Sequence, residues 1–591
     1  MGDRPVRNLR EQLALLRARG DLFEVRAEVD ARLEIAEIHR RTIAAGGPAL
    51  LFRNVRGSDF PVVTNLYGTP ERVRLAFGER PLKLVERAVR AAETLLPPSL
   101  GKLWSLRGLA RDLLRIGARR VRRGPILEVS EAPHLDRLPV LTCWQADGGP
   151  FVTLPLVFTE HPKTRKSNLG MYRLQIHGPA LTGMHFQIGK GGGFHLHAAE
   201  EAGRALPVTV FLGGPPALTL AAIAPLPEDV PEILLASLLL GEKLPRVAHE
   251  PHPLVAEAEF ALTGRVAPGV RRPEGPFGDH YGYLSLRHDY PVFEVERVFR
   301  RRDAIWPATV VGRPRQEDYH IGEYLQELLA PLFPLVMPAV RSLWSYGETG
   351  FHSLAAAVVR DRYPREALAS AFRILGEGQL SLTKVLLVTD RTVDLRDFRA
   401  VLRVLLERLD ARRDLFVFPG TSQDTLDYTG PRVNEGSKAV LLALGEARRV
   451  LPERYEGGPP PGARRVEVFA PGALVVEGER FAAAPDLADR VAAWPGLDPW
   501  PLAVLVDDAV EATRSVELFL WTTFTRMTPA ADLHGREVRD GRFHTGLAGP
   551  VVIDARMKPS YPPVLEVDDE TRDLVDRRWT EYGIPVPKEC S

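Results

Sequence analysis

The sequence is short of several residues and patterns that mark whole classes of protein. Only two cysteines, Cys143 and Cys590, occur in 591 residues, which excludes a disulfide scaffold and a cysteine-rich metal site. The formal net charge is +1, so no overall charge favours nucleic acid or an anionic membrane as a partner. The longest apolar run, Ile233–Leu240, is less than half of a membrane span, and no secretory signal opens the chain. We therefore expect a soluble, cytoplasmic protein with no integral membrane segment.

The patterns that are present predict a mixed α+β or α/β protein of several domains. Short apolar or alternating runs bounded by Gly and Pro follow one another between residues 126 and 302, as in a sandwich or barrel. Beyond Tyr319, helical and strand-like segments alternate, as in a layered α/β unit. We predict an N-terminal α/β segment at 1–125, a β-rich domain at 126–318, an α/β domain at 319–450, and a C-terminal extension at 451–591 that is partly packed as further α/β.

A glycine-rich run, Gly189–Gly193, contains a single cation, Lys190. Glycines let backbone amides approach a phosphate closely, so the run suits a phosphate-binding loop. The spacing matches neither a Walker loop nor a dinucleotide-binding fingerprint. A mobile turn without a ligand is the alternative interpretation.

His195 and His197 flank a single leucine a few residues later. Alternate residues of a strand point to the same side, and paired histidines of this kind are metal ligands in some hydrolases. The sequence predicts a His-X-His metal site only if this segment is a strand, and no further set of His and Asp ligands follows it.

Two acids, Glu274 and Asp279, are separated by a Gly-Pro-Phe-Gly turn. Such a turn can direct both carboxyl groups into one cavity, where burial or repulsion raises the pKa of at least one of them towards the range of a general acid. An arginine held between acids is a ready receptor for a substrate carboxylate, and Arg173 is the candidate. Solvated or capping acids are the alternative.

Several ordered motifs of the chain resemble the UbiD-type decarboxylases, a family that uses prenylated FMN to remove CO2 from aromatic and α,β-unsaturated acids. The similarity extends from the N-terminal helix to about residue 555. The motifs that carry it are NLGMYR (Asn168–Arg173), TGMHFQIGKGGG (Thr182–Gly193), FLGGPPA (Phe211–Ala217), PLPEDVPE (Pro225–Glu232), EGPFGDHYGY (Glu274–Tyr283), RRDAIWPATVVGRP (Arg301–Pro314), TKVLLVTD (Thr383–Asp390), GSKAVLLAL (Gly436–Leu444) and FLWTTFTRMTP (Phe519–Pro529).

The resemblance implies a nonoxidative carboxy-lyase whose domain at 126–318 is a central split β-barrel of the flavin-reductase type, flanked by α/β parts. It implies an aromatic acid as substrate, such as a hydroxybenzoate or naphthoate, or an α,β-unsaturated acid, with a role in quinone biosynthesis. It also implies a flavin prenyltransferase as the supplier of the cofactor, a homodimer or larger homo-oligomer, and a divalent cation, usually Mn2+, with K+ left open as a further ion.

The resemblance also assigns roles to individual residues. Arg173, oriented by Glu274, would position the substrate carboxylate, and Asp279 would protonate the carbon that CO2 leaves. Asn168 and Glu232 match ligands of the divalent cation, which as a hard ion suits oxygen donors. The positions that match cofactor-binding residues are Met171, Tyr172, Arg173, His185, Phe186, Gln187, Lys190, Gly191 and Lys384.

The chain departs from the family at Gly189, where the family has a histidine metal ligand. Water can fill vacant positions around an octahedral ion, and His185, His195 or His197 is a candidate replacement. The departure puts the affinity for metal and cofactor in question more than the acid–base residues. A His-X-His metal-dependent hydrolase and a noncatalytic flavin-binding member of the family stay open as alternatives.

Overall fold

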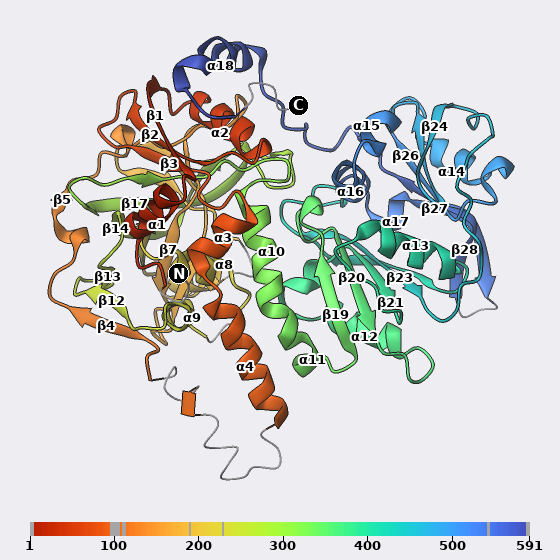
Figure 1. Cartoon of the computed structure of the whole chain (residues 1–591), viewed down its shortest axis with the longest axis horizontal. Coiled ribbons are helices and arrows are strands. Elements are labelled where there is room, and N and C mark those ends of the chain that lie inside the picture. The colour runs from red at the N-terminus through yellow and green to blue at the C-terminus, as the bar shows by residue number, and fades with distance from the viewer. Residues whose placement is uncertain are drawn as a thin grey trace. The chain divides into compact units, whose positions relative to one another are not determined.

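The structure is a computed structural model that describes residues 5–94, 107–108, 114–187, 191–226, 230–540 and 544–586. The chain forms two compact units: the first comprises Met1–Leu328 and Val564–Ser591, and the second comprises Leu329–Pro563. Figure 1 shows that each unit combines helices and sheets, so the expected mixed α+β multidomain architecture is confirmed. The division into four parts stays a prediction.

The first unit begins with a helix and a small sheet. Helix α1 (Leu9–Ala18) starts where the side chain of Asn8 accepts a hydrogen bond from the Glu11 amide, and it buries Leu9, Leu13 and Leu16, as the sequence predicts. Strand β1 (Leu22–Val29) pairs in parallel with β2 (Ala49–Val55), and helix α2 (Glu34–Ala44) connects the two strands. The sheet continues through β3 (Val62–Thr64) to β18 (Trp306–Pro307).

A larger sheet forms the centre of the first unit. Within the described residues it has nine strands and curls into an open half-barrel. The expected β-rich region therefore folds as predicted, although β14 and β17 are longer than the sequence patterns indicate. In spatial order the strands are β6 (Phe151–Val152), β9 (Leu174–Gly178), β10 (Leu181–Gly183), β17 (His288–Arg300), β14 (Phe260–Glu274), β11 (Leu206–Leu212), β7 (Leu156–Glu160) and β8 (Ser167–Met171), with β5 (Val129–Glu131) beside β17.

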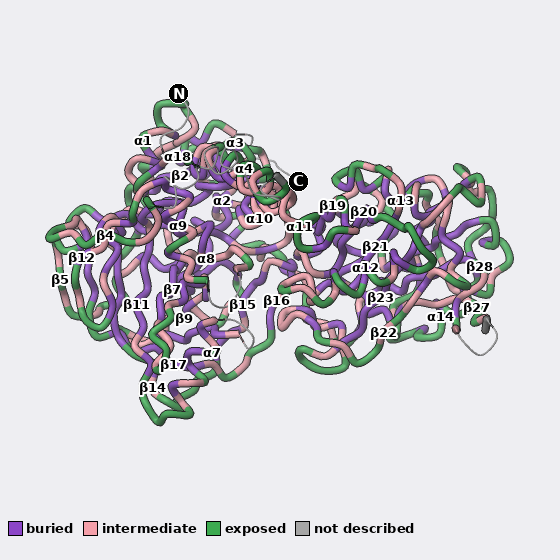
Figure 2. The backbone as a smooth tube through the Cα atoms, turned by 90° about the horizontal axis from the view of Figure 1, so that it is seen from below, coloured by how far each residue is buried: buried purple, intermediate pink, exposed green. Residues whose placement is uncertain are grey.

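Helices α7 (Gly191–Glu201), α8 (Pro216–Ile223) and α9 (Glu232–Leu240) pack against β8 and cover that end of the sheet. Helix α9 is apolar nearly all round, which suits a helix with neighbours on several sides. In Figure 2 the strands of this sheet are mostly coloured as buried, whereas the end of β14 that carries residues 268–273 is exposed. The start of β8 lies beside the first turn of α7, where Gly191 approaches Asn168, and beside the start of α9, where Glu232 accepts a hydrogen bond from the Leu169 amide.

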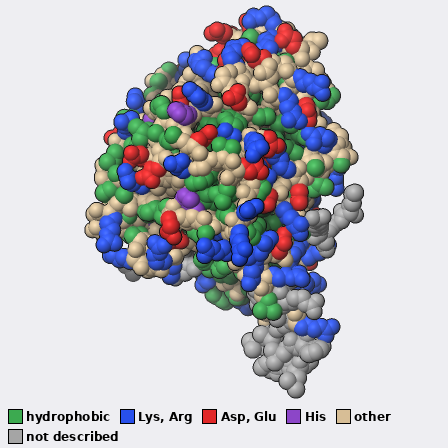
Figure 3. All heavy atoms as spheres, turned by 90° about the vertical axis from the view of Figure 1, so that its left-hand side faces the viewer, with side chains coloured by type: hydrophobic (Ala, Val, Ile, Leu, Met, Phe, Trp, Pro, Cys, Tyr) green, Lys and Arg blue, Asp and Glu red, His purple; other side chains and the backbone are tan. Residues whose placement is uncertain are grey.

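The surface charges and the helix lengths agree with the composition of the sequence. Figure 3 shows both basic and acidic side chains on one face of the molecule, in keeping with the balanced charge of the sequence. No helix of the described residues combines the length and the apolar composition needed to cross a bilayer.

The remaining helices and strands of this unit are α3 (Pro70–Phe77), α4 (Arg80–Thr94), α10 (Glu317–Leu329), β4 (Ala118–Val121), β12 (Leu244–Val247), β13 (Leu254–Val255), β15 (Phe277–Gly278) and β16 (Leu284–Ser285).

The C-terminal segment returns to the first unit and ends in helix α18 (Asp569–Tyr582), which packs against α2. Glu34 of α2 accepts hydrogen bonds from Arg578 and from the Tyr582 hydroxyl, and Arg41 pairs with Asp576 at 2.6 Å. Because Glu34 is fully buried, these contacts tie the end of the chain firmly to its beginning.

The second unit contains two sheets with parallel central strands. Among the described residues each sheet has five strands. Helices α12 (Glu366–Leu375), α13 (Phe398–Arg408) and α16 (Val516–Thr525) accompany the sheets. The first sheet runs β19 (Val340–Ser345), β20 (Leu354–Val359), β21 (Val385–Thr389), β23 (Glu435–Ala443), β22 (Leu415–Ser422), and the second runs β24 (Ala463–Ala470), β25 (Ala473–Gly478), β26 (Leu502–Val506), β28 (His544–Asp554), β27 (Leu533–Asp540).

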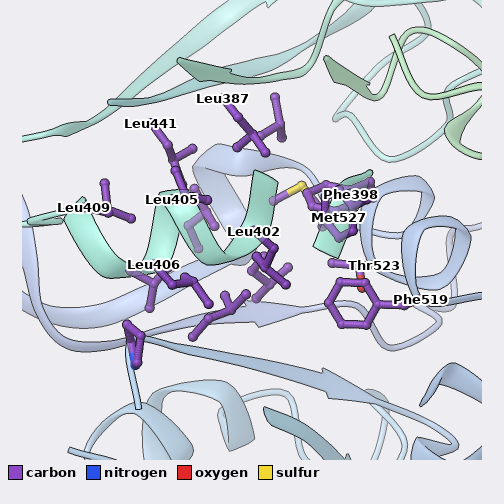
Figure 4. Close-up of a pocket in the computed structure, with 17 residues that line it drawn as sticks. Leu387, Phe398, Leu402, Leu405, Leu406, Leu409, Leu441, Phe519, Thr523 and Met527 are labelled. Carbon is purple, nitrogen blue, oxygen red and sulfur yellow. The ribbon is translucent and has the colours of Figure 1, made fainter. Parts of the chain in front are cut away.

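An apolar cavity lies beside α13, between the two sheets of this unit (Figure 4). Its walls are aliphatic and aromatic side chains such as Leu402, Leu405 and Phe519, and Thr523 brings a hydroxyl-bearing side chain to the wall. An unfilled apolar space costs stability, because the lining atoms lose dispersion contacts that a packed core would provide.

We expect Thr523→Ile to stabilise the protein by about 0.5–2 kcal/mol, since it adds apolar volume at the cavity wall and removes the hydroxyl. Leu405→Ala enlarges the same cavity and should cost about 2–5 kcal/mol. Chemical unfolding, followed by fluorescence and circular dichroism, measures both changes. A loss of stability in Thr523→Ile would mean that this wall is already tightly packed.

Candidate active site

Arg173 stands just beyond the end of β8, with its guanidinium group between a carboxylate and two aromatic rings. Its Nε donates a hydrogen bond of 3.0 Å to Oε1 of Glu274, and its Nη2 lies 3.4 Å from the Ser285 hydroxyl. The centre of the guanidinium lies 4.5 Å from the ring centroid of Phe277. A planar cation held on one edge and stacked on one face is fixed in orientation, which suits recognition of a second carboxylate.

Glu274, the last residue of β14, is buried and serves two partners with one oxygen. Its Oε1 accepts from Arg173 and also lies 2.9 Å from Nδ1 of His185. Burial opposes ionisation of Glu274, but the hydrogen bond to His185 and the charge of Arg173 outweigh it, so the pKa of Glu274 lies below its ordinary value. Glu274 is therefore a carboxylate at neutral pH.

His185 is neutral in this arrangement. Burial, assisted by the nearby charge of Arg173, lowers the pKa of His185 to about 4. Since Glu274 is ionised and accepts, the single proton of the neutral imidazole must sit on Nδ1. Its Nε2 is buried and meets no hydrogen-bond partner among the described residues, so an acceptor nitrogen faces the interior.

Asp279 follows the Gly-Pro-Phe-Gly turn directly and is the first residue of the loop that the paired strands β15 and β16 enclose. Its Oδ1 accepts a hydrogen bond of 2.9 Å from the Tyr281 amide, whereas its Oδ2 is buried without a partner in the described part of the chain. Burial raises the pKa of Asp279 to about 7, against the smaller opposing effects of His280, the Tyr281 amide and Arg173. A carboxyl group with such a pKa carries its proton in a substantial fraction of molecules at neutral pH.

Asn168 and Glu232 come together at the start of β8. The Glu232 side chain accepts a hydrogen bond of 2.8 Å from the amide of Leu169, the residue next to Asn168. Burial raises the pKa of Glu232 above its ordinary value, although the Leu169 amide opposes this shift. A half-buried carboxylate with few hydrogen-bond donors gains from a nearby cation, and an amide oxygen beside it is a suitable second ligand.

The first turn of α7 completes this part of the site. A Cβ atom on Gly191 would lie 2.0 Å from Oδ1 of Asn168, so any other residue there would displace the Asn168 side chain. The Gly192 amide donates to the Tyr172 hydroxyl at 3.2 Å, and the Tyr172 ring meets Phe186 edge to face at a centroid distance of 5.1 Å. The predicted residues thus form an aromatic wall beside the backbone of a helix start, while Met171 and Gln187 next to them are half-buried.

The structure does not test three of the remaining positions singled out in the sequence. Gly189 and Lys190 lie outside the residues that the structure describes. Lys384 belongs to the second unit, where its buried ammonium group donates to Asp427 at 2.7 Å. Its role near a phosphate stays a prediction.

The interpretation of His195 and His197 as alternate residues of a strand is wrong. Both lie in helix α7, where residues two apart point to nearly opposite sides. Nδ1 of His195 is buried 2.8 Å from the Thr159 hydroxyl, whereas His197 is exposed and faces Glu201. No three His, Cys, Asp or Glu side chains of the described residues are grouped as metal ligands, so the hydrolase interpretation loses its geometry.

Sequence reasoning missed three residues that support the turn between Glu274 and Asp279. Asp147 and Gln175 accept hydrogen bonds from the amides of Gly278 and Gly275, and Trp144 packs against Gly278. The only local signal was the Asp-Gly-Gly sequence that begins at Asp147, which is typical of a turn and does not indicate its partner.

The fold and the site together define a class of protein: an enzyme whose site combines an oriented arginine, an ionised glutamate and a buried carboxyl group with a raised pKa, as the binding and protonation of a small carboxylic acid would require. Three family models match the chain. They describe the N-terminal, Rift-related and C-terminal domains of 3-octaprenyl-4-hydroxybenzoate carboxy-lyase and cover residues 13–92, 119–314 and 319–443. The chain belongs to the UbiD family and is a carboxy-lyase.

Individual relatives agree with this assignment. The chain is 50% identical over 582 residues to a Chlamydia pneumoniae protein named as a subunit of 4-hydroxybenzoate decarboxylase, covering 97% of this chain and 98% of the relative. The UbiD-class enzyme HmfF from Pelotomaculum thermopropionicum, solved in complex with FMN, is 27% identical with a TM-score of 0.62, covering 77% of this chain and 98% of HmfF. The vanillic acid decarboxylase of Sedimentibacter hydroxybenzoicus shares the fold at 22% identity and a TM-score of 0.65, covering 79% and 96%.

Proposed function

We propose that the protein is a nonoxidative decarboxylase that uses prenylated FMN to remove CO2 from an aromatic or α,β-unsaturated carboxylic acid. The observation that carries the proposal is the trio of Arg173 and the buried acids Glu274 and Asp279, in which an oriented cation and a protonatable carboxyl group lie in one site. The curled sheet would serve as the split β-barrel of the flavin-reductase type that holds the cofactor.

Arg173 would bind and orient the substrate carboxylate. Glu274 and the Phe277 ring hold its guanidinium in one orientation, so little side-chain freedom is lost when substrate binds. A charge-assisted hydrogen bond of this kind contributes about 1.5–3 kcal/mol. Because Glu274 is ionised, it holds the Arg173 side chain in this orientation before the substrate binds.

Asp279 would donate the proton that replaces CO2. Its Oδ2 is buried, unpartnered within the described residues and protonated in a fraction of molecules near neutral pH, which are the properties that a general acid needs. After it donates, the negative charge of Asp279 lies within the field of Arg173, which favours the ionised form at that moment.

The residues fit a flavin phosphate and a divalent cation. Asn168 and Glu232 would hold the cation, for which Mn2+ is proposed, and the glycine-rich start of α7, whose backbone approaches Asn168 closely, would present its amides to a phosphate. Tyr172 and Phe186 would line the ring system together with Met171, His185 and Gln187. When bound, prenylated FMN supplies the electron sink that no protein side chain offers for decarboxylation at an sp2 carbon. K+ is proposed as a further ion.

Glu232→Gln is expected to reduce the bound metal at least about 10-fold, because a neutral amide cannot balance the charge of a divalent cation. Metal analysis of the purified protein and titration with Mn2+ followed by electron paramagnetic resonance give this result without an activity assay. Glu242→Gln, a change in a partly exposed residue that pairs with Arg7, is the control. Unchanged Mn2+ affinity in Glu232→Gln would remove this residue from the ligand set.

The substrate is proposed to be a hydroxybenzoate or a naphthoate, and the name of the Chlamydia pneumoniae relative supports the first. We further propose a role in quinone biosynthesis, a flavin prenyltransferase that supplies the cofactor in the cytoplasm, and a homodimer or larger homo-oligomer. An intact acid–base set favours this proposal over a noncatalytic flavin-binding protein.

The test is to co-express the chain with a flavin prenyltransferase and to analyse the purified protein by absorbance and mass spectrometry. The loaded protein is then incubated with a panel of aromatic and α,β-unsaturated acids, and CO2 release is measured. We expect a bound modified flavin and release of CO2 from at least one acid. As a second readout, the corresponding decarboxylated products are incubated with the loaded protein in D2O, where a decarboxylase can exchange the hydrogen that replaces CO2 for deuterium. A protein that binds the cofactor, releases no CO2 from any acid of the panel and shows no such exchange would contradict the proposal.

A further inference from the structure

The carboxylate of Asp147 connects two segments that are far apart in sequence. Its Oδ2 accepts hydrogen bonds from the amides of Cys143 and Trp144, at 3.0 and 2.9 Å. Its Oδ1 accepts a hydrogen bond of 2.8 Å from the amide of Gly278, the residue that precedes Asp279. One side chain therefore fixes its own loop, residues 142–149, and at the same time the turn that carries the proposed proton donor.

Two further contacts bind the same loop to the same turn. The Gly148 amide donates to the Pro276 carbonyl at 2.8 Å. Gln175 bridges the two segments, because its Oε1 accepts from the Gly275 amide at 2.8 Å and its Nε2 donates to the Gly148 carbonyl at 2.7 Å. The turn between Glu274 and Asp279 is thus held at Gly275, Pro276 and Gly278.

Trp144 restricts the turn from its other side. A Cβ atom on Gly278 would lie 2.2 Å from Cδ1 of Trp144, so the indole ring touches the backbone of the turn directly. The ring is itself fixed, since its Nε1 donates to the Val311 carbonyl at 2.9 Å and the Arg40 guanidinium lies 4.2 Å from the ring centroid. The turn has little freedom to shift while this loop stays in place.

We infer that Asp147 is a positioning residue for Asp279, acting through the Gly278 amide. Asp147 is half-buried and its two oxygens already serve three backbone amides, so it has no evident part in binding substrate. Proton transfer is sensitive to the placement of the donor, and a misplacement of about 1 Å can reduce a rate about 100-fold. This role rests on the proposed decarboxylation.

The test compares Asp147→Asn with wild type and with Asp532→Asn, in the full chain. An amide in place of the carboxylate keeps the size of the side chain but points an N–H group at one of its amide donors. Asp532 is the control because its carboxylate also accepts a backbone hydrogen bond, from the Thr528 amide at 2.7 Å, but lies in the second unit, where it is buried and pairs with Lys558 at 3.0 Å.

We expect Asp147→Asn to lower kcat about 10–100-fold with KM changed less than about 3-fold, because Arg173 and its partners stay in place. Amide hydrogen exchange followed by mass spectrometry should become faster in the peptide spanning residues 275–283, and Asp532→Asn should change neither property. Unchanged exchange of this peptide overturns the inference whether or not the protein is active, and unchanged kcat in an active protein also overturns it. Absence of CO2 release from wild type counts against the proposed function alone, since the exchange measurement still decides the role of Asp147.

Discussion

Replacing Asp279 with Asn is expected to reduce turnover by about 100- to 10,000-fold while the protein still binds its cofactor. The amide has the same size as the protonated carboxyl group, but its N–H is far too weak an acid to protonate carbon. Within the described residues Asp279 bonds to backbone amides of its own turn and not to Asn168 or Glu232, so flavin absorbance and metal content should stay at wild-type values. CO2 release and the absorbance spectrum of the purified variant measure the two properties.

Asp289→Asn is a suitable control for this experiment, because Asp289 is an exposed acid in β17, ten residues further along the chain. It should keep wild-type kcat. Asp279→Glu restores a carboxyl group and should recover part of the activity. A kcat of Asp279→Asn within about 3-fold of wild type would exclude Asp279 as the proton donor.

The wild-type enzyme should also lose activity as the pH rises through about 7, the value to which burial raises the pKa of Asp279. The sign follows from the role of the group, since only its protonated form can donate, and this form disappears above the pKa. A pH profile of kcat/KM should be level on the acid side of this transition and fall about 10-fold per unit well above it. A profile that rises through this range would contradict the assignment.

Glu274→Gln is expected to have the second largest effect, on stability as well as on activity. The change leaves Arg173 as a buried cation without its charged partner, and breaking a buried pair in this way costs about 3–5 kcal/mol. The change also weakens the hydrogen bond from Nδ1 of His185, because an amide oxygen carries less negative charge than a carboxylate oxygen. We expect kcat/KM to fall at least about 100-fold, because the substrate carboxylate then meets a displaced guanidinium.

Glu259→Gln separates the two effects. Glu259 is equally buried in the first unit, and the partners that its carboxylate has in the described part of the chain, such as Arg10 at 2.8 Å, are not site residues. Urea unfolding should show a comparable loss of stability in both variants, whereas kinetics should show a loss of kcat/KM only in Glu274→Gln. An active Glu274→Gln with normal KM would mean that Arg173 needs no carboxylate to hold its orientation.

Much of the fold could be predicted from local patterns. Asn8 accepts from the Glu11 amide as its spacing predicts, and the apolar runs around Val208–Leu212 and Val292–Val298 are strands of the central sheet. These features depend on neighbours in sequence, which a periodicity detects. Helix α7 was missed because its three leading glycines weaken the helical signal and its His-Leu-His sequence alternates like a strand.

The residue types of the site could be predicted from local patterns, but the contact between Arg173 and Glu274 was expected only from the family resemblance. Arg173 and Glu274 are 101 residues apart, and nothing local to either one indicates that they meet. The same holds for His185 and Asp147, which contact Glu274 and Gly278 over sequence separations of 89 and 131 residues. The raised pKa of Asp279 depends on complete burial of its carboxyl group, a property of the folded interior that a sequence pattern does not contain.

The return of α18 to α2 has a consequence for the order in which the protein can be made. A ribosome releases the N-terminal end first, and domains commonly fold as units in that order. The first unit breaks this order, because Glu34 acquires Arg578 and Tyr582 only after the whole second unit has been synthesised. Leu565, from the same late segment, donates to the Gly282 carbonyl at 3.0 Å, three residues beyond Asp279. In a nascent chain the loop at residues 279–283, which carries Asp279, therefore gains this hydrogen bond only after the second unit has been synthesised.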